Sequence, residues 1–216
     1  MTQTIANSSA LVADIVSDLG GQSGSSVEMM IGIGLVKDSD AVFFQYLGEE
    51  QKPAALVLPS GKPCTRMANI RLTGISIVDG LGDFNATKLN IFISTSAGRE
   101  LMLTSGLTTI WSQCAITSLM GLFNAYSLDQ PFTLDSWKGT SAYRPCFAAI
   151  RQGGVKVSDQ MMYDQLRDLR ADRATDKLTA VMRDAVEILN KAVTGGPVQP
   201  AEVVIENEQI TEHPDF

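Results

Sequence analysis

The chain contains 216 residues, of which 44% are apolar and 19% are charged. This length accommodates one domain with attached arms or two small domains, and the apolar content is sufficient to bury a core. The formal net charge of −7, taken alone, argues against a nucleic-acid partner. A single histidine, His213, and three widely spaced cysteines exclude a histidine-based metal cage, a disulfide framework and a four-cysteine zinc site. We therefore expect a binding protein that is not an enzyme and that holds neither a cofactor nor a metal.

No targeting signal is recognisable in the sequence. Residues 1–20 contain no Lys or Arg and include Asp14 and Asp18, whereas a secretory signal needs a basic start and an uninterrupted apolar run. The apolar run at 115–123 is about half the length that spans a bilayer. These features predict a cytoplasmic protein with reduced cysteines and no membrane partner.

Hydrophobic period and composition divide the chain into four parts. Residues 1–26 are predicted to form a short amphipathic helix, Ser8 to Gly20, followed by a Gly/Ser-rich linker. Residues 27–156 alternate apolar and polar positions, which predicts a β domain. Residues 157–194 have a helical period, and residues 195–216 form an acidic tail without period that is predicted to be disordered.

The β domain is predicted to contain a series of strands and one helix. Strands are expected at 27–35, 41–47, 54–58, 67–78, 88–94, 100–104, 132–138 and 143–151. The alternation slips by one residue at Gly74, which is typical of a bulge or a sharp bend in a strand. Thr108 or Thr109 is expected to open a helix between the strands that end at 104 and begin at 132.

This order of elements predicts a mainly β, α+β fold. Three strands, a helix and two further strands follow the order of an OB-like antiparallel barrel, with the helix between the third and fourth barrel strands. The bend at Gly74 fits a first barrel strand that serves both halves of the sheet. The prediction includes an added hairpin, an N-terminal helix and a long C-terminal helix, and another antiparallel α+β fold is the alternative.

A helical stretch begins near Ser158 and extends to about Val193. If it is continuous, it is too long to bury its apolar stripe on one small barrel, so a homo-oligomer is expected to form through that stripe. A break with a restart at Thr175 is the alternative. The stripe consists of Leu178, Val181, Met182, Ala185, Val186 and Leu189.

Charge is distributed unevenly along the chain. Residues 51–158 hold ten basic and five acidic residues, a net charge of +5, whereas 201–216 hold five acidic residues and no basic ones. A basic β module with outward aromatics is the pattern expected for a polyanion partner, although ordinary scatter explains the charge equally well. The candidate nucleic-acid-binding residues are Arg71, Lys88, Phe92, Trp137, Lys138, Tyr143, Arg144 and Arg151.

The candidate aromatics follow from a stacking argument. Bases stack on exposed aromatic rings while Lys and Arg contact the phosphates, and this combination binds single strands without reading their sequence. Trp137-Lys138 and Tyr143-Arg144 are expected to face each other across one hairpin. The alternative is that Trp137 and Phe92 fill the ends of the barrel or an oligomer interface.

Two further features have competing interpretations. The tail ends in Pro214, Asp215 and Phe216, which predicts an anionic and hydrophobic hook for a partner protein; a solubilising tail is the alternative. Asp164, Asp168, Asp172 and Asp176 recur at helical spacing, which suggests a cation site. Because Arg167, Arg170 and Arg173 interleave with them, a solvated helix face is the expected outcome.

The OB-like order over about 67–151, together with the tail that ends Pro214-Asp215-Phe216, resembles single-stranded DNA-binding proteins of the bacterial and phage type. The resemblance implies that a groove binds single-stranded nucleic acid, with DNA favoured, and that the tail tip recruits replication or recombination proteins. The barrel contains no closely matching diagnostic motif, and both the N-terminal and the long C-terminal helix depart from the plain bacterial pattern. An oligomeric structural or adaptor protein without nucleic-acid binding is the alternative, and an enzyme of unrecognised type is a third.

Overall fold

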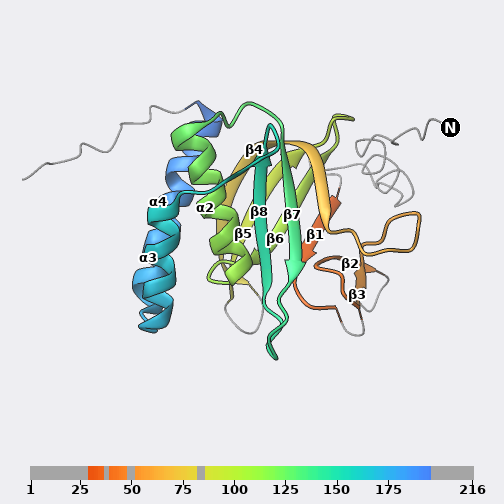
Figure 1. The fold of residues 1–216 in the computed structure, drawn as a ribbon, viewed down its shortest axis with the longest axis horizontal. Helices are drawn as coiled ribbons and strands as arrows, with labels where there is room; N and C mark the ends of the chain where they lie inside the picture. The colour runs from red at the N-terminus through yellow and green to blue at the C-terminus, as the bar shows by residue number, and fades with distance from the viewer. Residues whose placement is uncertain (1–28, 37–38, 48–51, 82–85, 196–216) are drawn as a thin grey trace, which may run out of the picture.

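The computed structural model describes residues 29–36, 39–47, 52–81 and 86–195. The predicted N-terminal helix and the tail tip, Pro214, Asp215 and Phe216, lie outside the described residues. Figure 1 shows the remaining chain as a large sheet with helices gathered on one side. None of the helices in the described part of the chain is long and apolar enough to cross a membrane.

The described elements confirm a mixed α+β protein. The strands are β1 (Met29–Ile33), β2 (Phe43–Leu47), β3 (Lys52–Ala55), β4 (Arg66–Leu81), β5 (Ala86–Ser94), β6 (Glu100–Gly106), β7 (Phe132–Lys138), β8 (Cys146–Gln152) and β9 (Val155–Val157). The helices are α2 (Ile110–Ala125), α3 (Gln160–Ala171) and α4 (Thr175–Thr194).

All nine strands belong to one sheet, in the order β3-β2-β1-β6-β5-β4-β7-β8-β9. Neighbouring strands are antiparallel except for β1 and β6, which are parallel. The five middle strands, β6-β5-β4-β7-β8, are contiguous, and α2 connects β6 to β7. The expected closed barrel is not formed by the described strands, because β1 pairs with β6 and β9 pairs with β8 at the two positions where a closing pair would form.

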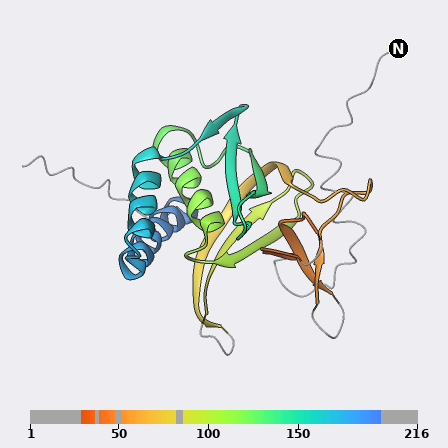
Figure 2. The ribbon, with the colours of Figure 1, turned by 60° about the horizontal axis from the view of Figure 1, so that its bottom comes forward.

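The predicted bend in β4 is confirmed. The register with β5 shifts between Leu72 and Gly74, and a second shift, against β7, lies between Met67 and Ile70. Asn69, inside the second shift, has a left-handed φ of 54°. These irregularities increase the local twist. The first half of β4 therefore pairs with β7 and the second half with β5, and Figure 2 shows the sheet curling between these two halves.

Helix α2 packs inside the curl of the sheet, where it contacts β8. Thr109 caps it as predicted, since its side chain accepts a hydrogen bond from the Ser112 N–H. Trp111 is buried, and its Nε1–H donates to Ser136 Oγ on β7 at 3.0 Å. The indole thus places an apolar ring in the core while its one polar atom remains satisfied.

The continuous C-terminal helix is wrong, and the alternative of a restart at Thr175 is confirmed. Arg173 has a left-handed φ of 56° between α3 and α4, which reverses the chain so that α4 packs against α2, α3 and β4. Asp159, rather than Ser158, caps α3. In the predicted oligomer stripe all residues but Val181 are fully buried within the protomer, so that stripe is not a free surface.

Several strand boundaries differ from the prediction, and β3 spans Lys52–Ala55 rather than 54–58. The largest differences, at β8 and β9, have local reasons. β8 begins at Cys146 rather than Tyr143, because Pro145 precedes it and Arg144 has a positive φ of 42° in the turn. β9 was not expected: Gly153 and Gly154 both have positive φ, which allows a tight turn back onto β8.

Candidate nucleic-acid interface

The most exposed tryptophan of the described chain lies on β7 and stacks on a phenylalanine of β8. Trp137 is 43% exposed, and its ring lies 5.8 Å from that of Phe147 at an interplanar angle of 18°. The expected pairing of Trp137 with Tyr143 is wrong, because the β7–β8 register places Phe147 opposite Trp137. Tyr143 instead lies in the turn, where it is 91% exposed.

A group of charged side chains lies on the same side of the sheet. Asp135 accepts a hydrogen bond from Arg66 Nε at 2.5 Å and another from Arg151 Nε at 3.1 Å. The hydrogen bond and the negative charge of Asp135 raise the pKa of the Arg66 guanidinium above its ordinary value. Lys156 on β9 is exposed and pairs in register with Arg151, so it adds a third cation to this group.

Strand register shows that these residues form one surface. Asp135 opposes Arg66 on β4 and Ala149 on β8, and Trp137 lies two residues farther along β7. Side chains two residues apart on a strand share a face and are about 7 Å apart. We call this surface the aromatic–basic face; it consists of Trp137, Phe147, Arg66, Asp135, Arg151 and Lys156. Its three cations exceed its single carboxylate by two charges.

Three of the predicted cations lie near the aromatic–basic face but are engaged by other groups. Arg144 pairs with Asp40 at 2.5 Å, and Lys138 Nζ donates to the Ser39 carbonyl at 2.5 Å. These two contacts attach the β7–β8 turn to the segment that precedes β2. Arg71 lies on β4 beyond the irregularity that follows Arg66. It donates a hydrogen bond to the Asp129 carbonyl. The sequence does not reveal these intramolecular partners.

Lys88 and Phe92 lie elsewhere, on the outer side of β5. Phe92 opposes Met102 on β6, and Met102 pairs in register with Met30 on β1. We call this surface the apolar face; it consists of Phe92, Met102, Met30, Phe44 and Tyr46. The structure thus separates the eight candidate binding residues into two regions of one curled sheet.

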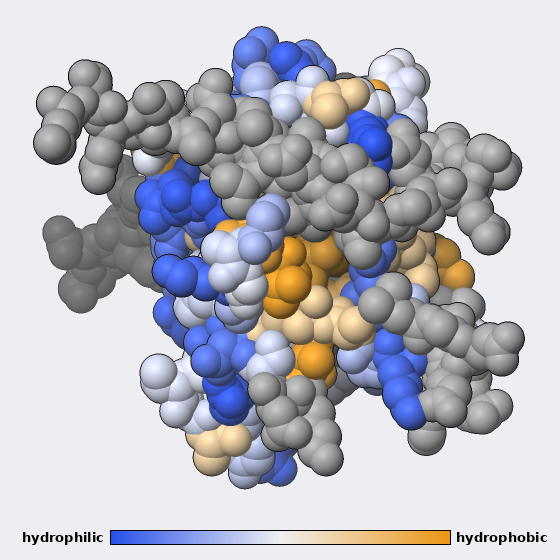
Figure 3. All heavy atoms as spheres, turned by 90° about the vertical axis from the view of Figure 1, so that its right-hand side faces the viewer, coloured by the Kyte–Doolittle hydropathy of each residue, from blue (hydrophilic) through white to orange (hydrophobic). Residues whose placement is uncertain are grey.

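The apolar face continues onto β2. The Phe44 ring lies over Gly32, where an added Cβ would meet ring carbons at 2.4 Å, and it contacts Tyr46 edge-on. Met30 and Tyr46 are 45% and 46% exposed. Figure 3 shows apolar atoms gathered between hydrophilic ones on the side of the molecule where β1, β2 and β3 lie. Exposed apolar groups of this kind are typical of an interaction surface.

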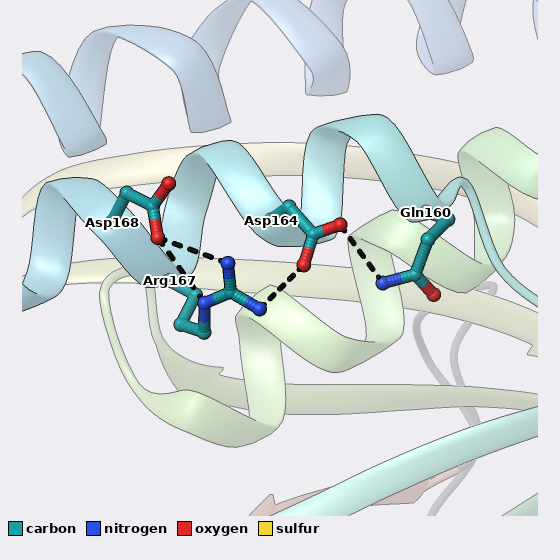
Figure 4. Close-up of polar contacts among 4 residues, drawn as sticks. All are labelled: Gln160, Asp164, Arg167 and Asp168. Atoms are coloured by element: carbon teal, nitrogen blue, oxygen red, sulfur yellow. Dashed lines mark hydrogen bonds and ion pairs between the residues drawn. The ribbon is translucent and has the colours of Figure 1, made fainter.

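The acidic row of α3 forms ion pairs rather than a cation site. Arg167 bridges Asp164 at 2.6 Å and Asp168 at 3.1 Å, as Figure 4 shows. Arg170 points to the other side and donates to Gln113 of α2 at 2.6 Å. Within the described ranges, no three His, Cys, Asp or Glu residues come together as metal ligands. The expected solvated helix face is confirmed.

The three cysteines are free thiols in or near the core. Cys64 and Cys114 are buried and Cys146 is half-buried. Burial raises the pKa of all three thiols above the ordinary value, so each is protonated at neutral pH. Cys64 and Cys114 are core residues, and Cys146 packs against the core.

The predicted site residues did not include four members of the aromatic–basic face: Arg66, Asp135, Phe147 and Lys156. Arg66 and Arg151 converge only because β4, β7 and β8 are adjacent, which the sequence order alone does not reveal. Phe147 was detectable, since Pro145 predicts a later start for β8 and a later start places Phe147 opposite Trp137.

Comparison of the chain with protein-family models, with curated proteins and with solved structures finds no match.

Proposed function

We propose that this protein binds single-stranded nucleic acid, with DNA favoured, through the aromatic–basic face and without catalysis. One observation carries the proposal: a half-exposed tryptophan, backed by a second aromatic ring, shares one face of the sheet with three cations on neighbouring strands. Stacking platforms beside basic side chains are the common means of holding single strands independently of sequence.

The geometry assigns each group a role. Phe147 supports one side of the Trp137 ring, so the indole is held in place and loses little freedom when a base stacks on it. Asp135 holds Arg66 and Arg151 through their Nε atoms, which leaves other guanidinium N–H groups to contact phosphate oxygens. Lys156 extends the positive charge toward β9.

The order of the middle strands supports the proposal. A bent β4 in the centre, flanked by β5–β6 and by β7–β8, with α2 between β6 and β7, corresponds to an OB arrangement that is left open. This strand order is the feature on which the resemblance to single-stranded DNA-binding proteins rests. We extend the proposal to the tail, whose tip, Pro214 to Phe216, would recruit replication or recombination proteins.

Tryptophan fluorescence tests the proposal directly. Trp111 is buried and hydrogen-bonded, so a base that stacks on the protein should quench Trp137 and leave Trp111 unchanged. We expect single-stranded oligonucleotides to quench the emission, duplexes of equal length to quench it less, and binding to weaken as salt rises. An emission that no oligonucleotide changes, together with no binding by an independent method, would overturn the proposal.

A second candidate, an oligomeric adaptor, is favoured by the apolar face. Lys88 and Glu100 lie at opposite ends of the β5–β6 ladder, with Phe92 and Met102 between them. A two-fold axis through the middle of this ladder would place Lys88 against the partner's Glu100 and bury the apolar residues. The face is therefore self-complementary in charge, and a second copy of the chain is its proposed occupant.

Charge reversal tests the self-association. Glu100→Lys would place like charges together in the two-fold pair and should weaken association, whereas the double variant Glu100→Lys with Lys88→Glu should restore it. Sedimentation measures both effects. A wild-type protein that sediments as a monomer at tens of micromolar, or a double variant no better than the single one, would contradict this interface.

A further inference from the structure

A pocket lies at the edge of β8, beside the aromatic–basic face. β9 pairs with β8 only at Ile150, Arg151 and Gln152, so residues 146–149 have no strand neighbour on that side in the described chain. Helix α2 and the start of α3 border the gap. They enclose a cavity of about 370 Å³ whose lining includes Trp137, Phe147, Tyr163, Ser118, Gln160 and Lys156.

The walls of the pocket are aromatic on two sides. Trp137 and Phe147 belong to both the pocket and the aromatic–basic face, so the two are continuous. Tyr163 contributes a third ring from α3, where it is half-buried. A flat, unsaturated group of modest size is therefore the shape that this pocket accommodates best.

Polar groups from two helices line the same pocket. Ser118 of α2 is only 3% exposed, and it lines the pocket. A serine hydroxyl can both donate and accept a hydrogen bond. Gln160 donates through Nε2 to Asp164 at 3.2 Å, and Figure 4 shows its carbonyl oxygen directed away from that carboxylate. Ser118 and Gln160 thus offer hydrogen-bonding atoms for the edge of a planar ligand.

We propose that this pocket takes one unstacked base of the strand bound on the aromatic–basic face, an inference that rests on the proposed function. A nucleobase is planar, which suits the three rings, and its edge carries the donors and acceptors that Ser118 and Gln160 would satisfy. Lys156 lines the pocket mouth and pairs in register with Arg151, so the phosphate of the same nucleotide would lie within the cationic group.

An abasic scan of the oligonucleotide tests the inference on the full chain. An eight-nucleotide oligothymidylate is compared with versions in which each base in turn is missing, and fluorescence anisotropy gives the affinities. We expect two sensitive positions, each losing about tenfold, because a base is lost from the Trp137 ring in one case and from the pocket in the other. In the variants Gln160→Ala and Ser118→Val, only the loss at the pocket position should shrink, to about that of the insensitive positions.

The variants have a matched control and separable outcomes. Gln130→Ala replaces an exposed glutamine outside the pocket and should leave the whole scan unchanged. If strand binding depends on Trp137 but neither pocket variant alters any abasic loss, the pocket holds no base and the proposed function stands. If no version of the protein binds the oligonucleotide, both the inference and the proposed function fall. Gln160→Ala removes only an exposed side chain, so it keeps the test decisive if Ser118→Val fails to fold.

Discussion

The aromatic–basic face and the apolar face are parts of one curled sheet, yet they differ in charge and in the side chains that surround their aromatic rings. The first combines a stacked Trp137–Phe147 pair with three cations around one carboxylate. The second combines Phe92, Met102 and Met30 in a row, with Lys88 and Glu100 at its ends. The bend in β4 turns the two surfaces away from a common plane, so a partner of one need not contact the other.

This difference shows that outward alternation alone does not identify a binding surface. Both faces have the period of two that the sequence displays, and both carry an aromatic and a basic residue. What distinguishes them is the neighbouring strand: β4 and β8 bring arginines to Trp137, whereas β6 and β1 bring methionines to Phe92. The two faces are therefore expected to bind separate partners.

Removal of the indole should have the largest effect. Trp137→Ala should weaken single-strand binding by about 1–3 kcal/mol, the usual loss for one stacked base. Phe92→Ala is the matched control on the apolar face and should leave strand affinity unchanged. Equilibrium titration at one salt concentration measures both. Equal losses in the two variants would show that the strand crosses both faces and would remove the distinction.

A buried change should affect stability without favouring either face. Ser136→Ala leaves the Trp111 Nε1–H without its partner in the core, which should lower the free energy of unfolding by about 1–3 kcal/mol. Urea unfolding measures this loss. Strand affinity, measured well below the unfolding midpoint, should be unchanged because Ser136 faces inward while Trp137 faces outward. If the Ser136→Ala variant folds fully but binds the strand weakly, strand affinity depends on core packing and not only on the exposed side chains.

Local patterns in the sequence predicted much of the fold. The strand at 132–138, the Thr109 cap and the bend at Gly74 all depend on neighbouring residues, and the structure confirms each of them. The parallel pairing of β1 with β6 was not predictable in this way, because it joins segments about seventy residues apart with no local signal. That pairing, together with the pairing of β9 with β8, leaves the expected barrel open.

The site was only partly predictable for the same reason. Trp137 and Arg151 were candidates because of their residue types and their places in predicted strands, but their partners Phe147, Arg66 and Asp135 depend on register and strand order. The oligomer stripe on α4 was misassigned because its period shows that a face is buried and not what covers it. Arg173 has a left-handed φ that reverses the chain before α4, and the apolar stripe of α4 is therefore buried against the core of its own protomer.

Removal of the carboxylate from the aromatic–basic face should increase binding. Asp135→Asn deletes the only negative charge of that face, and both paired arginines are about half exposed, so they keep their charge and their access to phosphate. We expect strand affinity to rise about two- to fivefold at low salt and the gain to disappear at high salt, where screening is strong. If Asp135→Asn binds the strand more weakly, the position that Asp135 gives to the two guanidinium groups contributes more to affinity than the removal of its negative charge.

The smallest effect should appear in the salt dependence of two neutralised cations, one on each face. Each phosphate contact of a single strand contributes about 0.7 to the slope of log affinity against log salt. Arg151→Gln should therefore reduce the steepness of that slope by about 0.7, because Arg151 lies beside Asp135 and Lys156 where the strand is proposed to run. Lys88→Gln removes the same charge from the molecule but lies on the apolar face, so its slope should match that of the wild type. The pair separates contact from net charge: if strand binding responded only to the overall charge of the protein, the two variants would shift the affinity alike and leave the slopes alike. A reduced slope in Lys88→Gln would extend the path of the strand onto β5 and β6, and a two-fold dimer through that face would then have to compete with it.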